Sequence, residues 1–307
     1  MSDFCVDVRD LTKKFGEFTA VDGVSFQIPY GSIFGFLGPN GAGKSTTIRM
    51  LLGILPISSG SGKVLALDIR TQSQQIRSRV GYMSQKFSLY EDLTVAENLN
   101  FFAGVQGLPP TLANARREHL LKLCRLEEYQ KQLAFHLPGG IRQRLAFAVA
   151  LLHDPDIIFL DEPTGSVDPA LRRYFWDIIV QLSRSGKTVM VTTHYMDEVE
   201  RCDQICFIAA GRLIAQGSPS QIKEKALPGQ MYHFIPRRRL ESLDFLASQG
   251  WIAAPFPSGN RIRFLVPSSE SVDDFQWQSV RDLAQGPVEA TEATLEDVFI
   301  ALQRQGA

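Results

Sequence analysis

The sequence lacks an excess of charge of either sign. Its 32 lysines and arginines nearly balance its 33 aspartates and glutamates, which leaves a formal net charge of −1 at pH 7. A protein that is held on nucleic acid by bulk charge carries a basic face or arm. The charge balance therefore predicts no nucleic-acid partner.

Long apolar runs are missing too. Uninterrupted apolar stretches such as LAFAVALL (145–152) fall far short of the roughly 18 residues that cross a bilayer. The opening MSDFCVDVRD shows no basic segment followed by an apolar one, so we expect no signal peptide. Any role at a membrane is therefore expected to pass through a partner protein.

Cysteine is scarce, and the four residues are Cys5, Cys124, Cys202 and Cys206. Cys202 and Cys206 lie in RCDQICFI, but a metal site would need a second paired cluster of cysteine or histidine. We therefore expect structural thiols in a reducing cytosol. Internal repeats and low-complexity tracts are also missing from the sequence.

What is present suffices for a buried core, with 44% apolar and 21% charged residues over 307 positions. That length is typical of about two domains. Apolar runs of strand length alternate with helical patterns over the first ~225 residues, which predicts a parallel, doubly wound α/β core. The strands are expected at 4–8, 24–28, 32–38, 63–67, 80–84, 157–161, 188–193, 204–209 and 211–217.

The stretch from about 86 to 152 is helical without a clear strand, and it predicts a helical insert in the first domain. Turn residues surround a short helix near 217–230, and the chain then continues as short strands and helices. We therefore expect a first domain at 1–225 and a small α+β domain at 226–307.

GPNGAGKST (38–46) fits the pattern G-x-x-x-x-G-K-[ST] between the apolar strand SIFGFL and a helical segment. This is the context of a P-loop, whose backbone N–H groups and helix N-terminus bind phosphate oxygens. We expect Lys44 to reach the β- and γ-phosphates and the Ser45 hydroxyl to bind Mg²⁺. The loop consists of Gly38, Pro39, Asn40, Gly41, Ala42, Gly43, Lys44, Ser45 and Thr46.

DPDIIFLDEPT (154–164) predicts a buried strand that ends in two carboxylates. Ligands of parallel sheets bind at this carboxyl edge. Asp161 suits an outer carboxylate for Mg²⁺, and Glu162 suits the group that orients or deprotonates an attacking water. The alternative is an acidic pair that caps the next helix.

These motifs, together with the glycine pair of LPGGIRQR (137–144), resemble the ATP-binding subunits of ABC transporters over about residues 1–225. The resemblance implies a P-loop NTPase fold of ABC type that binds ATP and Mg²⁺. It implies that Gly139 and Gly140 offer N–H groups to the γ-phosphate of an ATP held by another protomer. The protein would then be a homodimer, or a heterodimer with another ATP-binding cassette.

The same resemblance assigns four further positions. Phe15 matches the aromatic residue that stacks on adenine, although a core aromatic residue is the alternative. Gln85 matches the glutamine that touches Mg²⁺ and links the site to the helical insert, with a polar strand end as the alternative. His194 matches the histidine that contacts the γ-phosphate, and its alternative is a structural role. Asp168 matches a residue of the loop that crosses the dimer interface.

Two departures from the family pattern stand out. Pro138 replaces a serine, so one phosphate-directed hydrogen bond is missing, although proline suits a first helical turn. Gly165 and Ser166 stand in the reverse of the order that many relatives show. The first departure suggests the hypothesis that this chain pairs with a different ATPase half whose signature keeps the serine.

The segment KFSLYEDLTVAENLNFF (86–102) is the expected contact for a transmembrane permease subunit, through Phe87, Leu89 and Tyr90. The alternative is that these residues pack inside the insert. TLEDVFIALQRQG (294–306) and TTHYMDEVERCDQI (192–205) resemble ATPase subunits of daunorubicin-type exporters. An amphipathic end helix would explain the former equally well.

The resulting prediction is an ATPase that drives an exporter from the cytoplasmic face of the inner membrane. One alternative is a regulatory half with weak ATPase activity, paired with a second cassette. Another is a soluble, non-transport ABC protein, although such proteins usually carry two cassettes and a single P-loop occurs here. Whether the chain is part of a longer two-cassette protein stays open.

Overall fold

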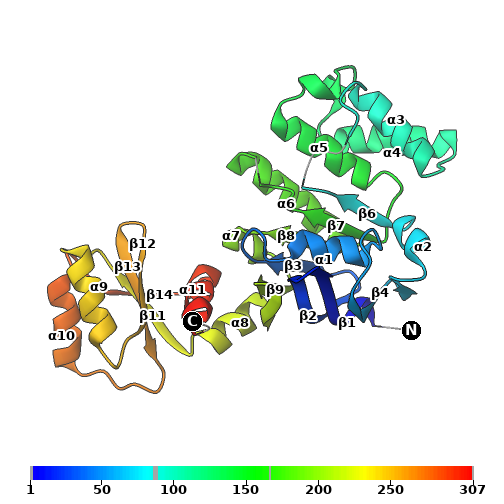
Figure 1. The fold of residues 1–307 in the computed structure, drawn as a ribbon. Coiled ribbons are helices and arrows are strands. Elements are labelled where there is room, and N and C mark those ends of the chain that lie inside the picture. Colours follow the sequence, from blue (N-terminus) through cyan, green and yellow to red (C-terminus); the bar gives the residue numbers. More distant parts are fainter. Residues whose placement is uncertain (1–2, 86–88, 166, 306–307) are drawn as a thin grey trace. The chain divides into compact units, whose positions relative to one another are not determined.

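The computed structural model describes residues 3–85, 89–165 and 167–305. The chain divides into two compact units, Met1–Gln216 and Gly217–Ala307. The sequence suggested a boundary at 225/226. In the structure the division falls at 216/217, which puts the short helix that follows residue 217 in the second unit. Figure 1 shows the elements of both units.

The first unit is built on a six-stranded sheet in the order β10-β9-β3-β8-β7-β6. Neighbours from β9 through β6 pair in parallel. Every residue of β3, β7 and β8 is buried, which is typical of parallel strands covered on both faces. The strands are β3 (Ile33–Leu37), β6 (Val80–Met83), β7 (Ile157–Asp161), β8 (Thr188–Thr193), β9 (Gln204–Ala209) and β10 (Arg212–Gly217).

A second sheet of the first unit, in the order β2-β1-β4-β5, is antiparallel. The sequence predicted strands here but assigned them to the parallel core, which was wrong. β1 and β2 are joined by a two-residue turn, and so short a connection permits only antiparallel pairing. The strands are β1 (Phe4–Phe15), β2 (Phe18–Pro29), β4 (Ser59–Val64) and β5 (Leu67–Asp68).

Helices cover the parallel sheet. The helix α1 (Lys44–Leu51) contacts β7 as well as β2 and β4, so it lies between the two sheets, as Figure 1 shows. The helix α6 (Pro169–Arg184) packs on β8 and β3, and α7 (Met196–Val199) contacts the same two strands. The helix α2 (Ser73–Arg77) leads into β6.

The predicted helical insert lies between β6 and β7, and the described residues there contain helices but no strand. The helix α3 packs on α4 and α5, and α5 also contacts β6, which connects the insert to the parallel sheet. A capping box at Thr94 and Glu97 fixes the start of α3. The helices are α3 (Val95–Val105), α4 (Pro110–Leu123), η1 (Glu127–Tyr129), η2 (Ala134–His136) and α5 (Gly139–Ala150).

The second unit is the small α+β fold that the sequence predicted. Its antiparallel sheet has the order β12-β13-β11-β14. A separate core that includes Phe234, Trp251 and Phe264 lies within the unit. The elements are α8 (Pro219–Ala226), β11 (Gly229–Phe234), α9 (Arg239–Ser248), β12 (Ala253–Ser258), β13 (Arg261–Pro267), α10 (Asp274–Leu283), β14 (Glu289–Thr291) and α11 (Leu295–Gln305).

Across the described residues of both units, each helix is too short or too polar to span a bilayer.

Candidate functional site

The glycine loop joins β3 to α1 at the carboxyl edge of the parallel sheet. Gly43 has φ 105°, and a Cβ there would lie 2.6 Å from the carbonyl oxygen of Ala20. A Cβ at Gly38 would lie 2.1 Å from the carbonyl oxygen of Ile208. Only glycine permits such approaches of backbone to backbone. The loop therefore curls tightly and delivers Lys44 as the first residue of α1.

Lys44 is buried at the base of this loop, with 4% of its side chain exposed. Its Nζ donates to the carbonyl oxygens of Gly38 (2.8 Å) and Pro39 (3.1 Å). The same Nζ lies 3.1 Å from Glu162 Oε1. The ammonium group is thus fixed inside the curl of the loop.

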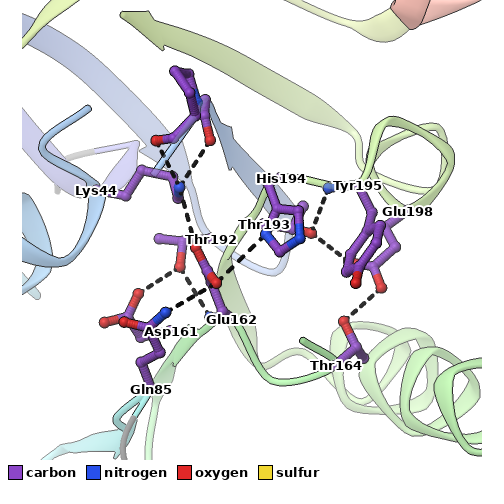
Figure 2. Close-up of polar contacts among 12 residues, drawn as sticks. Lys44, Gln85, Asp161, Glu162, Thr164, Thr192, Thr193, His194, Tyr195 and Glu198 are labelled. Carbon is purple, nitrogen blue, oxygen red and sulfur yellow. Dashed lines mark hydrogen bonds and ion pairs between the residues drawn. The ribbon is translucent and has the colours of Figure 1, made fainter. Parts of the chain in front are cut away.

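Glu162 follows directly after β7 and has φ 51°, an unfavourable value for a residue with a side chain. Its N–H is held by Thr192, through the carbonyl oxygen (3.1 Å) and Oγ1 (3.0 Å). The carboxylate lies between three groups: Lys44, Gln85 Nε2 (3.1 Å to Oε2) and His194 Nδ1 (3.4 Å to Oε2). Figure 2 shows these groups converging on the carboxylate from three different segments.

Asp161, the last residue of β7, lies beside them and is 1% exposed. Its Oδ1 accepts a hydrogen bond of 2.7 Å from Thr192 Oγ1. Its Oδ2 is buried and has no hydrogen-bond partner among the residues that the structure describes. An unpaired buried carboxylate oxygen is costly unless it meets a cation or another ligand. The chemistry of this oxygen therefore fits a magnesium ligand.

A pocket of about 510 Å³ opens over the loop. Most of the predicted loop residues line it together with Phe15, Gln85 and Glu162, so the fold brings these residues together. Phe18 and Ala20 also line it, and neither lies in a motif that marks it as a site residue. The lining is Phe15, Phe18, Ala20, Asn40, Gly41, Gly43, Lys44, Ser45, Thr46, Gln85 and Glu162.

Several predicted residues do not line this pocket. Gly38, Pro39 and Ala42 belong to the loop itself, Asp161 is bound by Thr192, and His194 lies beside Glu162. The other three are Gly139, Gly140 and Asp168. Gly139 and Gly140 form the first turn of α5 in the helical insert, and Gly139 is exposed. Asp168 is exposed as the N-cap of α6. The N–H groups of Leu171 and Ala170 donate to its carboxylate and hold the pKa of Asp168 below its ordinary value. A single copy of the chain thus leaves these three residues outside the pocket.

The expected permease contact is described only in part, because Phe87 lies outside the described residues, as does Ser166 of the second departure. Leu89 is half-buried. Tyr90 is 50% exposed, and its ring lies 4.6 Å from that of Phe101, which is 42% exposed. The expected contact segment, 86–102, therefore carries an exposed aromatic pair.

The comparisons with known proteins place the chain among ATP-binding cassettes. Residues 21–165 match the family model described as ABC transporter. A probable multidrug ABC transporter ATP-binding protein, YbhF of Escherichia coli, is 48% identical over 221 residues, covering 72% of this chain but 38% of YbhF. The Nod factor export ATP-binding protein I of Ralstonia nicotianae is 44% identical over 218 residues, covering 71% of this chain and 68% of that protein.

Solved structures agree with this placement. The cbiO1 subunit from Clostridium perfringens, part of the ABC transporter complex cbiONQ, is 28% identical with a TM-score of 0.66, covering 72% of this chain and 91% of that chain. A dimeric post-hydrolysis state of the ATP-binding cassette MJ0796, bound to ADP and Pi, is 26% identical with a TM-score of 0.65. That match covers 69% of this chain and 98% of that one. The fold class predicted from the sequence is confirmed.

Proposed function

The chain belongs to the ATP-binding proteins of the ABC transporter family, and from this we propose that it hydrolyses ATP to drive a separate membrane subunit of an exporter. The observation that carries the proposal is the Glu162 carboxylate, which contacts the loop lysine, Gln85 and His194 at once. Export, in preference to uptake, is supported by the names of the multidrug and Nod factor relatives.

Nucleotide binding begins at the glycine loop. Its N–H groups and the N-terminus of α1 bind phosphate oxygens, and Lys44 neutralises their charge. Phe15 is half-exposed at the rim of the pocket, where its ring can stack on adenine. Phosphate oxygens compete with Glu162 for the lysine, so binding weakens the Lys44–Glu162 ion pair and frees the carboxylate.

Asp161, Ser45 and Gln85 are the residues that would hold Mg²⁺. Asp161 offers a buried oxygen without a hydrogen-bond partner among the described residues, while Ser45 and Gln85 line the pocket. When bound, the cation supplies positive charge to the β- and γ-phosphate oxygens. Asp161 is kept in place by Thr192, which also holds the backbone of Glu162.

Hydrolysis follows from the position of Glu162. Its carboxylate accepts a hydrogen bond from the attacking water and orients the oxygen toward the γ-phosphorus. A bond forms between that oxygen and phosphorus, the bond to the bridging oxygen breaks, and the water proton passes to the carboxylate or to the released phosphate. His194 Nδ1 lies 3.4 Å from Glu162 Oε2, and in this proposal the His194 side chain contacts the γ-phosphate.

A second cassette completes each site in this proposal. Gly139, Gly140 and Asp168 lie outside the pocket of their own chain, and the N-terminus of α5 suits a phosphate held by a neighbour. Head-to-tail pairing of two cassettes around two ATP molecules would bring these residues to the opposite pocket. The partner is a second copy or a different cassette.

A permease subunit on the cytoplasmic face of the membrane is the proposed mechanical partner. The exposed pair Tyr90 and Phe101 supports a docking surface in the segment that follows Gln85 in the sequence. Through Gln85, movement of the site on ATP binding would reach that surface. Replacing the Tyr90 ring is therefore expected to weaken the permease complex more than ATP binding.

The test of the function uses two variants of the full chain. Lys44→Ala removes the charge that holds the phosphates, and is expected to weaken ATP binding at least about tenfold, since charged hydrogen bonds contribute about 1.5–3 kcal/mol. Glu162→Gln is expected to keep ATP binding and lose about 100-fold in hydrolysis rate. Fluorescent-nucleotide titration and phosphate release measure the two effects.

Lys63→Ala, an exposed lysine on β4, serves as the matched control and is expected to behave as the unmodified chain. Normal ATP capture and turnover by Lys44→Ala would contradict the proposed site. Normal turnover by Glu162→Gln would contradict the role of that carboxylate but not the proposed nucleotide site.

A further inference from the structure

Glu198 is a carboxylate that is almost completely removed from water, with 2% of the residue exposed. It lies in the short helix α7. A buried carboxylate needs partners for both oxygens. Thr193 Oγ1 donates to Oε2 (2.6 Å) and Thr164 Oγ1 donates to Oε1. Arg172 Nε lies 3.4 Å from Oε1, at ion-pair distance. Three separate segments therefore meet at one side chain.

The two threonines lie close in sequence to His194 and Glu162, which carry the proposed chemistry. Thr193 ends β8, directly before His194, and its Oγ1 also accepts the N–H of Tyr195 (3.0 Å). The Thr193 hydroxyl thus holds the backbone on the far side of His194. Thr164 lies two residues beyond Glu162, whose positive φ makes its backbone dependent on outside support. Figure 2 shows Glu198 between these two hydroxyls.

Arg172 adds a second connection to the same histidine. It comes from α6, and its guanidinium carbon lies 3.9 Å from the centre of the Tyr195 ring. The Tyr195 ring in turn lies 4.2 Å from the His194 ring. Glu198 orients the cation that packs on Tyr195, so it restrains His194 through its backbone and through its ring.

We propose that Glu198 is a positioning residue that holds His194 and the Glu162 loop in one fixed relation for phosphoryl transfer. This inference rests on the proposed function, because it assigns Glu198 to the hydrolysis step. Glu198 itself does not line the pocket, and its effect passes through the two threonines and the stacked pair of Arg172 and Tyr195.

Such a role has a distinct kinetic consequence. ATP binding depends on the glycine loop, Lys44 and the aromatic rim, whereas the Glu198 side chain is hydrogen-bonded to Thr164 and Thr193. The orientation of the attacking water depends on Glu162 and His194, and a misplacement of about 1 Å at a reacting centre costs about 100-fold in rate. Disturbing Glu198 should therefore lower kcat and leave the ATP dissociation constant unchanged.

The experiment compares Glu198→Gln, Thr164→Val and Thr193→Val in the full chain. Each keeps the size of the side chain and removes one element of the network. Each is expected to lower kcat by about 10-fold to 100-fold, with the ATP dissociation constant within about threefold of the unmodified chain. Thermal unfolding is recorded for each, and rates are measured well below the lowest melting temperature. Glu200→Gln, an exposed glutamate two residues away, is the matched control.

A double variant tests whether Glu198 acts through Thr164. If Glu198 acts through Thr164, then Glu198→Gln combined with Thr164→Val should lose little more rate than either change alone. Unchanged kcat in all three single variants would overturn the inference, as would a parallel loss of ATP binding and kcat. If instead the unmodified chain fails to bind or hydrolyse ATP, the proposed function itself fails, which separates the two outcomes.

Discussion

Lys44 and Glu162 carry opposite charges where water is almost excluded, with 4% and 9% of their side chains exposed. Removing one member of a buried ion pair leaves the other uncompensated and typically costs about 3–5 kcal/mol. In Lys44→Ala the remaining Glu162 carboxylate keeps its hydrogen bond from Gln85, which reduces this cost, whereas the carbonyl oxygens of Gly38 and Pro39 lose their donor, which adds to it. The free energy of unfolding of Lys44→Ala should accordingly be measured beside its loss of ATP binding.

Phe18 is a second aromatic ring at the rim of the pocket. It pairs with Phe15 across the β1–β2 hairpin, and both rings line the pocket while 63% and 50% exposed. Base–aromatic stacking contributes about 1–3 kcal/mol. We predict that Phe18→Ala raises the ATP dissociation constant at least about fivefold in a fluorescent-nucleotide titration. Hydrolysis at saturating ATP should stay unchanged, because Phe18 is not among the contacts of Glu162.

Tyr30→Ala removes another half-exposed aromatic ring, which does not line the pocket, and so controls for a general effect of aromatic truncation. Equal ATP affinity in Phe18→Ala and the unmodified chain would show that the Phe18 ring plays no part in ATP binding. A loss in Phe15→Ala without one in Phe18→Ala would assign the stacking to Phe15 alone.

The sequence predicted the pocket residues that occupy motifs, and missed those whose role depends on pairing. Lys44 and Glu162 stand at fixed places in quoted patterns, and the fold brings them to 3.1 Å. Phe18 becomes a pocket residue only through the register of a hairpin, although FGEF already places two phenylalanines around a turn. Glu198 meets Thr164, 34 positions away, only after β7 and β8 lie side by side, and nothing local marks that contact.

At the scale of elements, the most informative departure from the family's sequence pattern lies at the start of α5. Pro138 is its N-cap residue, with φ −55° and ψ 151°, and its side chain offers no oxygen to the first helical N–H groups. If a neighbour's phosphate binds this end, a serine would add one hydrogen bond. We predict that Pro138→Ser raises the ATPase rate of the purified chain by about tenfold, from about 1.5 kcal/mol for a charged acceptor.

The helix α4 supplies a matched control for this change. Its N-cap is Pro109, with φ −57° and ψ 144°, almost the same backbone conformation at an exposed position of the insert. Pro109→Ser improves a helix cap in the same way but is not at the proposed phosphate contact. Equal rates for Pro138→Ser and the unmodified chain would remove the hypothesis of a weakened signature and a different ATPase partner.

Elements themselves were predicted better than their assembly into sheets. Apolar runs at 157–161 and 188–193 match β7 and β8, because strands buried on both faces leave a continuous apolar pattern. The first strands of the chain show similar runs, yet they form a separate antiparallel sheet. A strand's pattern records how deeply it is buried and says nothing about which neighbour it pairs with.

At the scale of the whole molecule, the two units contain separate cores. The first has a core that includes Phe26, Ile48 and Phe159, and the second has one that includes Phe234 and Trp251. The pocket residues all lie between positions 15 and 162, and His194 is also in the first unit. We propose that the first unit is the ATP-binding domain and that the second is an accessory domain.

This division predicts that a chain ending at Ser218 folds and binds ATP. The cut follows β10, so the six-stranded sheet stays complete, and every residue that lines the pocket is retained. The ATP dissociation constant should lie within about threefold of the full chain's value. Titration with a fluorescent nucleotide measures it, and thermal unfolding shows whether the shortened chain is folded. A folded product that has lost ATP binding would mean that residues 219–307 contribute to the site.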